Sequence, residues 1–170
     1  MQKIVLVVFC FFSHLCFSLE GVAMKEQIPQ TMKSIYYTKY GDPVDVLKMN
    51  KEKPLPKCGS KEVLVEVYAA ALNPADYKII EGNFRITGNM IKRQPGFDFS
   101  GRVVKVGSDV KGEFEVGDVV HGMTPLQKTG TLSEYHAVKA SCLAKKPEEM
   151  SFEEAAGLPL VGLTSSVIRP

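Results

Sequence analysis

The segment EVLVEVYAAA, residues 62–71, constrains the fold of this chain more than any other. In an extended strand its Val63, Val65 and Val67 share one face, because successive side chains point to opposite sides of a sheet. Further strands are predicted in short apolar segments separated by glycine or proline turns: residues 32–37, 44–49, 100–107, 119–122, 131–139 and 143–146. Many short strands of this kind are typical of a small, mostly antiparallel β-barrel.

Two short helices interrupt the β pattern. A proline suits the first turn of a predicted helix over residues 74–81, which Asn73 caps. A second helix begins at Ser151, where Glu154 three positions later completes a capping box. Pro159 interrupts this second helix. The sequence therefore predicts a mostly β fold with short helices.

The composition is that of an ordinary globular domain. The 170 residues are 45% hydrophobic and 24% charged, which suits one domain with a buried core. The formal net charge is +2 without a basic run, so nothing indicates a nucleic-acid partner. Outside the N-terminal segment the cysteines are Cys58 and Cys142, which could pair in the secretory pathway but are favoured as free, half-buried thiols.

The N-terminal segment differs from the rest of the chain. A lysine at position 3 precedes a largely apolar run over residues 4–19, and small residues follow at positions 21–23. This layout predicts a secretory signal peptide over residues 1–23 and a linker over residues 24–31, because the apolar run is short for a membrane span. The alternatives are an uncleaved anchor, or a mis-assigned upstream exon and a cytoplasmic protein.

Five motifs follow one another in the remaining sequence: NPADYK at 73–78, PGFDFSG at 95–101, VGDVV at 116–120, GTLSEY at 130–135 and AAGLPLVGLT at 155–164. In this order they resemble the medium-chain dehydrogenase/reductase superfamily, and most closely its zinc-free branch, the NADPH-dependent quinone and enone oxidoreductases. The resemblance implies a GroES-like catalytic barrel over residues 32–150. It also implies that residues 151–170 begin the helix that links this barrel to a nucleotide-binding domain.

The same resemblance implies an activity and candidate site residues. The family enzymes transfer a hydride from NADPH to quinones or α,β-unsaturated carbonyl compounds. Lys78 and Tyr77 stand at the catalytic position, where a positive charge would stabilise an enolate oxygen, and Asn73 and Thr164 match cofactor contacts. Structural explanations stay open for each: a helix cap for Asn73, a solvated side chain for Lys78, packing for Tyr77 and a helix-terminus hydroxyl for Thr164.

Two aspartates lie beside these candidates. Asp76 falls in the first turn of the predicted helix, where complementing the helix dipole explains a carboxylate. For Asp98 we expect hydrogen bonds to neighbouring backbone rather than catalysis. The glycines of the second motif, residues 95–101, are expected to supply torsional freedom where backbone lies tightly beneath the site.

The residues at the metal positions argue against zinc. The zinc alcohol dehydrogenases place a Cys where Asn73 stands and a His-Glu pair where Phe97 and Asp98 stand, whereas catalytic zinc needs three such ligands. His121 and His136 lack ligand spacing. Without a Lewis acid to stabilise an alkoxide, reduction of an activated C=C bond or a quinone is the more plausible reaction.

The nucleotide-binding half of the family enzymes has no counterpart in this sequence. A Rossmann domain opens on a glycine-rich strand-to-helix turn, and the glycines at 112 and 117 lie between predicted strands instead. We therefore expect weak NADPH binding and no activity from this chain alone, and a homo-oligomer only if a longer form exists. The alternatives are a stand-alone interaction module and a piece of a zinc alcohol dehydrogenase.

Overall fold

The computed structural model describes residues 28–83, 94–110, 112–125 and 130–167. The predicted signal peptide, and the linker up to residue 27, lie outside the described residues. Within the described ranges, no helix is long and apolar enough to cross a membrane.

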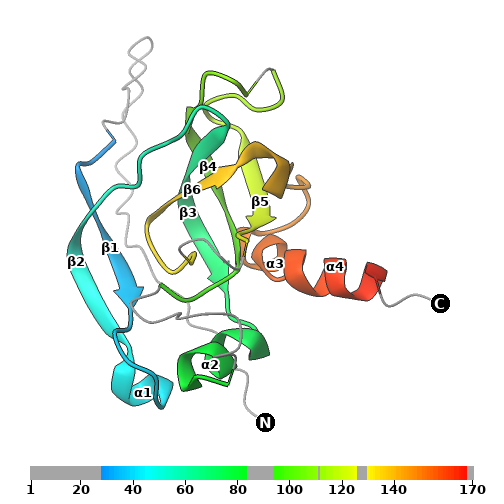
Figure 1. Cartoon of the computed structure of the whole chain (residues 1–170). Helices are drawn as coiled ribbons and strands as arrows, with labels where there is room; N and C mark the ends of the chain where they lie inside the picture. The colour runs from blue at the N-terminus through cyan, green and yellow to red at the C-terminus, as the bar shows by residue number, and fades with distance from the viewer. Residues whose placement is uncertain (1–27, 84–93, 111, 126–129, 168–170) are drawn as a thin grey trace, which may run out of the picture.

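A five-stranded antiparallel sheet forms the body of the domain (Figure 1). Its strands in spatial order are β6 (Tyr135–Lys139), β3 (Glu62–Ala71), β4 (Asp98–Val106), β5 (Val119–Met123) and β7 (Leu143–Lys145). A short 3-10 turn, η2 (Ala140–Cys142), connects the two edge strands β6 and β7. The predicted mostly β, antiparallel fold with short helices is confirmed.

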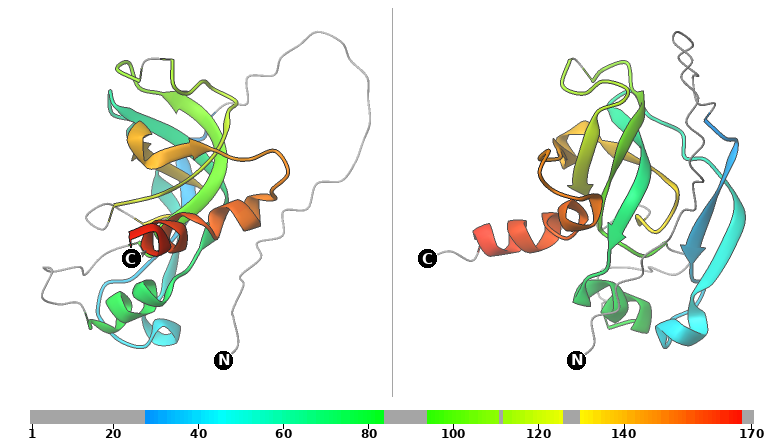
Figure 2. Two further views of the ribbon diagram at one scale, coloured as in Figure 1. Left: turned by 90° about the vertical axis from the view of Figure 1, so that its right-hand side faces the viewer. Right: turned by 180° about the vertical axis from the view of Figure 1, so that it is seen from behind.

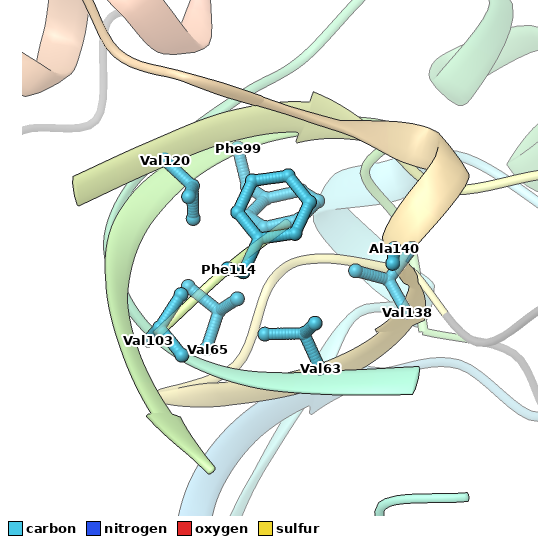
Figure 3. Packing of buried hydrophobic residues seen from close by; sticks show 8 residues of the cluster. All are labelled: Val63, Val65, Phe99, Val103, Phe114, Val120, Val138 and Ala140. Atoms are coloured by element: carbon cyan, nitrogen blue, oxygen red, sulfur yellow. The ribbon is translucent and has the colours of Figure 1, made fainter. Parts of the chain in front are cut away.

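The hydrophobic core fills the inside of this curved sheet (Figure 3). Its buried members are Val63, Val65, Phe99, Val103, Phe114, Val120, Val138 and Ala140. The alternation in β3 explains the packing, because Val63 and Val65 are fully buried and Val67 packs against the same cluster. Full burial of each valine contributes roughly 1.5 kcal/mol or more to stability.

A two-stranded sheet stands beside this body (Figures 1 and 2). It pairs β1 (Thr31–Tyr36) with β2 (Lys48–Pro54), and a bridge between Ser34 and Ser133 connects β1 to the segment before β6. The predicted partner strand over residues 44–49 was placed too early.

Two local features explain where the strand boundaries differ from the prediction. Residues 43–46 form the helical turn α1 (Pro43–Val46), because the side chain of Asp42 accepts a hydrogen bond from the N–H of Val44 at 2.9 Å. Strand β6 begins at residue 135 rather than 131, because Thr131 is bonded to the loop before β4 through its N–H and the carbonyl of Gly96, at 3.1 Å.

Three further helices lie at the ends of the sheet: α2 (Pro74–Glu81), α3 (Phe152–Ala156) and α4 (Pro159–Val167). The predicted capping box of α3 is confirmed, with hydrogen bonds of 2.8 and 3.1 Å between Ser151 and Glu154. Helix α3 packs against β3, β4 and β5, whereas α4 extends away from the sheet and buries none of its residues (Figure 2).

Candidate functional site

The candidate site begins where β3 ends and α2 starts. The backbone N–H of Asn73 donates to Oδ2 of Asp76 at 2.7 Å, and the N–H of Asp76 donates to the carbonyl of Asn73 at 2.9 Å. The Asn73 side chain faces this first turn, but its Nδ2 donates to Oδ2 of Asp98 at 2.9 Å. Asn73 therefore does more than cap α2: its amide binds a carboxylate on another strand.

Asp98, the first residue of β4, is the centre of the arrangement. Its side chain is fully buried, and its two oxygens accept hydrogen bonds from different elements. Oδ2 accepts from Asn73 at 2.9 Å, and Oδ1 accepts from the N–H of Leu160 at 3.0 Å. The expectation of a backbone hydrogen bond holds, but the backbone partner is 62 residues away in the sequence.

Burial raises the pKa of Asp98 from 3.8 to about 6, because a carboxylate without water is penalised. The hydrogen bonds from Asn73 and Leu160 favour the charged form and oppose this rise. The negative charge of the nearby Asp76 adds to the rise. The carboxyl group of Asp98 therefore releases its proton at a higher pH than an exposed aspartate does.

Asp76 has a larger role than complementing the helix dipole. It is only 4% exposed, and its Oδ1 accepts a hydrogen bond of 2.8 Å from the N–H of Gly96 while its Oδ2 binds Asn73. Burial raises its pKa, against the effect of these two hydrogen bonds. Asp76 therefore attaches α2 to the loop that leads into β4, a tertiary contact that helix-dipole reasoning cannot predict.

The glycines of the 95–101 motif serve two different purposes. Gly96 has a φ of +95°, so the expected torsional freedom is needed there. At Gly101 the expected tight approach of backbone is present, because a Cβ would lie 2.0 Å from the backbone oxygen of Glu66 on β3, but torsional freedom is not the reason for the glycine. Gly101 is therefore required by the close approach of two strands.

Helix α4 carries the other predicted cofactor contact. The Oγ1 of Thr164 donates to the carbonyl of Leu160 at 2.7 Å, and Thr164 is exposed. Because the N–H of Leu160 binds Asp98, a series of hydrogen bonds connects Asn73 to Thr164 through Asp98 and Leu160. We refer to these three hydrogen bonds as the Asp98 relay.

Tyr77 and Lys78, the predicted catalytic residues, lie on α2 and are both exposed. Tyr77 is 45% exposed, so its predicted alternative, packing, accounts for only part of its surface. The three bonds of the Asp98 relay include neither of these side chains. Both catalytic candidates and Asn73 thus lie on or at the start of α2, Thr164 lies on α4, and the relay joins the two cofactor candidates.

A small cavity lies on the opposite, buried side of α2. Its volume of about 20 Å³ is enough for one water molecule, whereas pockets for organic ligands are usually hundreds of Å³. It is lined by residues of α2 and the loops around it, including Asp76, Ile79, Ile80 and Gln94. As the described residues form it, this cavity is therefore too small to hold an organic substrate.

The potential metal ligands have other partners. Among the described residues, no group of three or more His, Cys, Asp or Glu side chains is placed to hold a metal ion. The ring of His136 packs against Phe99 with centroids 5.2 Å apart, and Nδ1 of His121 lies 3.2 Å from the carbonyl of Ala155. Cys58 and Cys142 are free and half-buried, as predicted.

Sequence reasoning missed Ser100, which helps to hold α3 against the sheet. The Oγ of Ser100 donates to the carbonyl of Phe152 at 2.5 Å. Ser100 and Asp98 are two residues apart on β4 and so lie on one face, and Ser100 pairs with His121 on β5. The two-residue spacing of Asp98 and Ser100 was the signal in the sequence that both side chains lie on one face of the strand. The sequence does not show which helix contacts that face.

Comparison with known proteins places this arrangement in a family. Residues 59–148 match the alcohol dehydrogenase GroES-like domain. A 2-methylene-furan-3-one reductase from Solanum lycopersicum is 45% identical over 139 residues, which cover 78% of this chain and 35% of that protein. An NADPH-dependent alkenal/one oxidoreductase, chloroplastic, from Arabidopsis thaliana is 41% identical over 146 residues, covering 82% and 37%.

Solved structures agree with this placement. The quinone oxidoreductase from Coxiella burnetii superposes with a TM-score of 0.73 at 36% identity, covering 80% of this chain and 43% of that one. This chain therefore spans roughly two fifths of the length of these relatives, all from their N-terminal part. The chain belongs to the alcohol dehydrogenase GroES-like domain family, and its relatives are NADPH-dependent alkenal and quinone oxidoreductases of the medium-chain dehydrogenase/reductase superfamily.

Proposed function

We propose that this chain is the catalytic barrel of an NADPH-dependent oxidoreductase that reduces quinones or α,β-unsaturated carbonyl compounds by hydride transfer. The observation that carries the proposal is the 2.9 Å hydrogen bond between Asn73 and Asp98. These two residues stand where the zinc branch of the superfamily has metal ligands. Here they offer an amide and a carboxylate, and both oxygens of the carboxylate already accept hydrogen bonds. Neither position offers a thiolate or an imidazole, so this pair of side chains does not suit zinc.

The cofactor candidates suit the nicotinamide end of NADPH, which when bound would supply the hydride. Asn73 is half-buried beside the exposed start of α2, and the hydroxyl oxygen of Thr164 is exposed one helical turn after Leu160. An amide and a hydroxyl can orient a carboxamide by hydrogen bonds. The described residues contain no glycine-rich strand-to-helix turn for the phosphates, so this chain alone should bind NADPH weakly.

The catalytic candidates suit the substrate. The Lys78 ammonium is exposed on α2, where it can approach a carbonyl oxygen that gains negative charge as the hydride adds to the conjugated carbon. The exposed hydroxyl of Tyr77 can donate a hydrogen bond to the same oxygen. Together they would stabilise an enolate without a metal ion.

A fusion protein tests this proposal. The chain, joined within α4 to the C-terminal part of the tomato relative, should oxidise NADPH when an enone or a quinone is added. It should not oxidise a primary alcohol with NADP⁺, and it should contain no dialysis-resistant zinc. The 170-residue chain alone should show no turnover. NADPH oxidation that depends on added zinc, or alcohol oxidation, would contradict the zinc-free assignment.

A second candidate function, an interaction module, is favoured by the exposed apolar side chains of α4. Val161, Leu163 and Val167 are 49%, 54% and 82% exposed. If the fused protein is inactive while the 170-residue chain forms a homo-oligomer through α4, this second function gains support. Sedimentation of the wild-type chain and of Leu163→Asp would show whether α4 mediates association.

The destination of the protein is also a proposal. We propose that residues 1–23 direct the chain to the secretory pathway, on the basis of their sequence alone. The Arabidopsis relative is chloroplastic by name, so a leader for another compartment is the rival interpretation. The N-terminal sequence of protein purified from its native cells distinguishes cleavage near residue 23 from an intact Met1.

A further inference from the structure

The Asp98 relay connects two residues that the proposed function assigns to cofactor binding. The Nδ2 of Asn73 donates to Oδ2 of Asp98, and the N–H of Leu160 donates to Oδ1 of the same carboxylate. The carbonyl of Leu160 then accepts from the hydroxyl of Thr164. All three hydrogen bonds have donor–acceptor distances between 2.7 and 3.0 Å, within the normal range.

Position 98 requires two acceptors at once. Both partners of the Asp98 side chain are donors, so each of its oxygens must accept. An asparagine has one acceptor oxygen and one donor amide, and a protonated carboxyl group also carries a donor. Either change therefore places a donor towards Asn73 or Leu160. Leu160 offers only its N–H here, whereas the Asn73 amide can turn over and accept through its Oδ1, so an asparagine at position 98 keeps both bonds only if the Asn73 amide is reversed.

The relay is the connection between α4 and the start of α2. Helix α4 buries none of its residues but contacts β5, and the hydrogen bond from Leu160 to Asp98 attaches its first turn to β4. Asp98 itself is fully buried. The hydroxyl of Thr131 donates a further hydrogen bond, outside the relay, to the backbone carbonyl of Asp98 at 3.1 Å and so holds the start of β4. A buried acceptor fixed in this way can set the positions of both donors.

We infer that Asp98 is a positioning residue for cofactor binding, which holds the Asn73 amide and, through Leu160, the Thr164 hydroxyl in one fixed arrangement. This inference rests on the proposed function. Asp98 itself would not touch NADPH, because its side chain is fully buried and both oxygens are occupied. Its effect would be exerted through the two residues that it holds.

Among the described residues, one titratable group acts on Asp98 and a second lies on the neighbouring strand β5. Asp76 on α2 is the carboxylate whose charge affects it, and His121 on β5 pairs with Ser100, two residues along β4. Helix α4 has the sequence PLVGLTSSV and no titratable side chain. A His121→Gln variant is therefore the control for any effect of this imidazole.

The first experiment uses NMR on the 170-residue chain. The side-chain NH₂ of Asn73 and the backbone N–H of Leu160 should titrate together with one midpoint near the Asp98 value of about 6. The same titration should persist in His121→Gln and vanish in Asp98→Asn. Different midpoints for the two groups, or unchanged titration in Asp98→Asn, would overturn the inference.

An exchange of the two side chains is a sharper version of this test. In the double variant N73D/D98N, the amide introduced at position 98 can donate to the carboxylate introduced at position 73, while its oxygen accepts from Leu160. Both hydrogen bonds therefore return. Hydrogen exchange at the Leu160 N–H should be at least tenfold faster in Asp98→Leu, which has no side-chain acceptor, than in the wild type, and should stay close to the wild-type rate in the double variant. Additive effects of the two substitutions would count against the relay.

The second experiment measures kinetics in the fusion protein with the tomato C-terminal part. Asp98→Asn should raise KM for NADPH roughly 10- to 100-fold, with a smaller change in KM for the enone, because only the cofactor contacts are displaced. Asp109→Asn, an exposed carboxylate on a turn, is the matched control and should leave both unchanged. If the fusion protein is active and Asp98→Asn leaves the KM for NADPH unchanged, the positioning role is refuted but the proposed function is not. An inactive wild-type fusion would refute the proposed function, and the NMR titration would then decide whether the relay exists.

Discussion

Ser100 and His121 pair across β4 and β5, and each contacts a backbone carbonyl of α3. The Ser100 hydroxyl donates to Phe152, and Nδ1 of His121 lies 3.2 Å from the carbonyl oxygen of Ala155. Because a carbonyl oxygen only accepts hydrogen bonds, Nδ1 must carry the imidazole proton. With Asp98 on the same face of β4, these side chains attach the α3–α4 segment to the sheet.

The first prediction concerns Ser100. Ser100→Ala should lower the free energy of unfolding by about 1–2 kcal/mol, because it removes the side-chain donor to a partly buried carbonyl of α3. Ser108→Ala, which removes an exposed hydroxyl bonded to Asp109, should change it by less than about 0.5 kcal/mol. Urea denaturation of both variants measures the difference. Equal effects would show that the Ser100 contact contributes nothing specific.

The second prediction concerns Gly101. An alanine Cβ there would lie 2.0 Å from the backbone oxygen of Glu66, so the strands β3 and β4 would have to separate. Gly101→Ala should therefore cost more than about 3 kcal/mol of stability or prevent folding.

Gly162 on α4 is the matched control, because nothing lies within 4 Å of its added Cβ. Gly162→Ala should stabilise the protein slightly, by up to about 1 kcal/mol, since alanine is the better helix former. Thermal denaturation followed by circular dichroism compares the two variants. A stable, folded Gly101→Ala protein would contradict the strand spacing described for β3 and β4.

The third prediction concerns pH. Burial raises the pKa of Asp98 from 3.8 to about 6, so the folded protein binds this proton more tightly than the unfolded chain does. The contribution of Asp98 to stability is therefore present at low pH and is lost as the pH rises towards 6, by roughly 3 kcal/mol at most.

Subtracting the free energy of unfolding of Asp98→Asn isolates this contribution. The raised pKa of Asp76 changes the stability of both proteins in the same direction, so its effect should largely cancel in the difference between them. Urea titrations between about pH 4 and pH 8 should show the wild type losing stability relative to Asp98→Asn up to a pH slightly above 6, and a constant difference beyond that. A difference that grows in favour of the wild type over the same range would reverse the sign and disprove the effect of burial.

The fourth prediction separates a catalytic from a structural role in the fusion protein. Lys78→Ala should lower kcat for an enone roughly 10- to 1000-fold, as expected for loss of one stabilising charge. It should change stability by less than about 0.5 kcal/mol, because Lys78 is exposed. Asn73→Ala should instead lower stability by about 1–3 kcal/mol, because it removes a hydrogen bond to the buried Asp98 carboxylate, and it should raise KM for NADPH. If kcat survives Lys78→Ala, Lys78 is only a solvated helix residue.

The local features of this fold were predictable because their causes lie within a few residues. The alternation of Val63 and Val65 places β3, and the Ser151–Glu154 capping box begins α3. Helix α1 was missed although its cause is also local, because an Asp-Pro pair that caps a helical turn was interpreted as a turn before a strand.

The candidate site was less predictable because its connections are long-range. Asn73 and Asp98 are 25 residues apart, and Asp98 and Leu160 are 62 apart. A sequence pattern shows that Asp98 is polar within an apolar strand, but not which donors its oxygens meet. Gly101 shows the same limit, since its reason lies on the neighbouring strand β3.

The central claim, hydride transfer from NADPH to an activated double bond, is tested most directly by isotope transfer in the fusion protein. With NADPH that carries deuterium on the transferred position, the account predicts one deuterium at the β-carbon of the reduced enone and a solvent proton at the α-carbon. Deuterium on the carbonyl carbon, giving an allylic alcohol, would contradict it, as would product formation without transfer of the label.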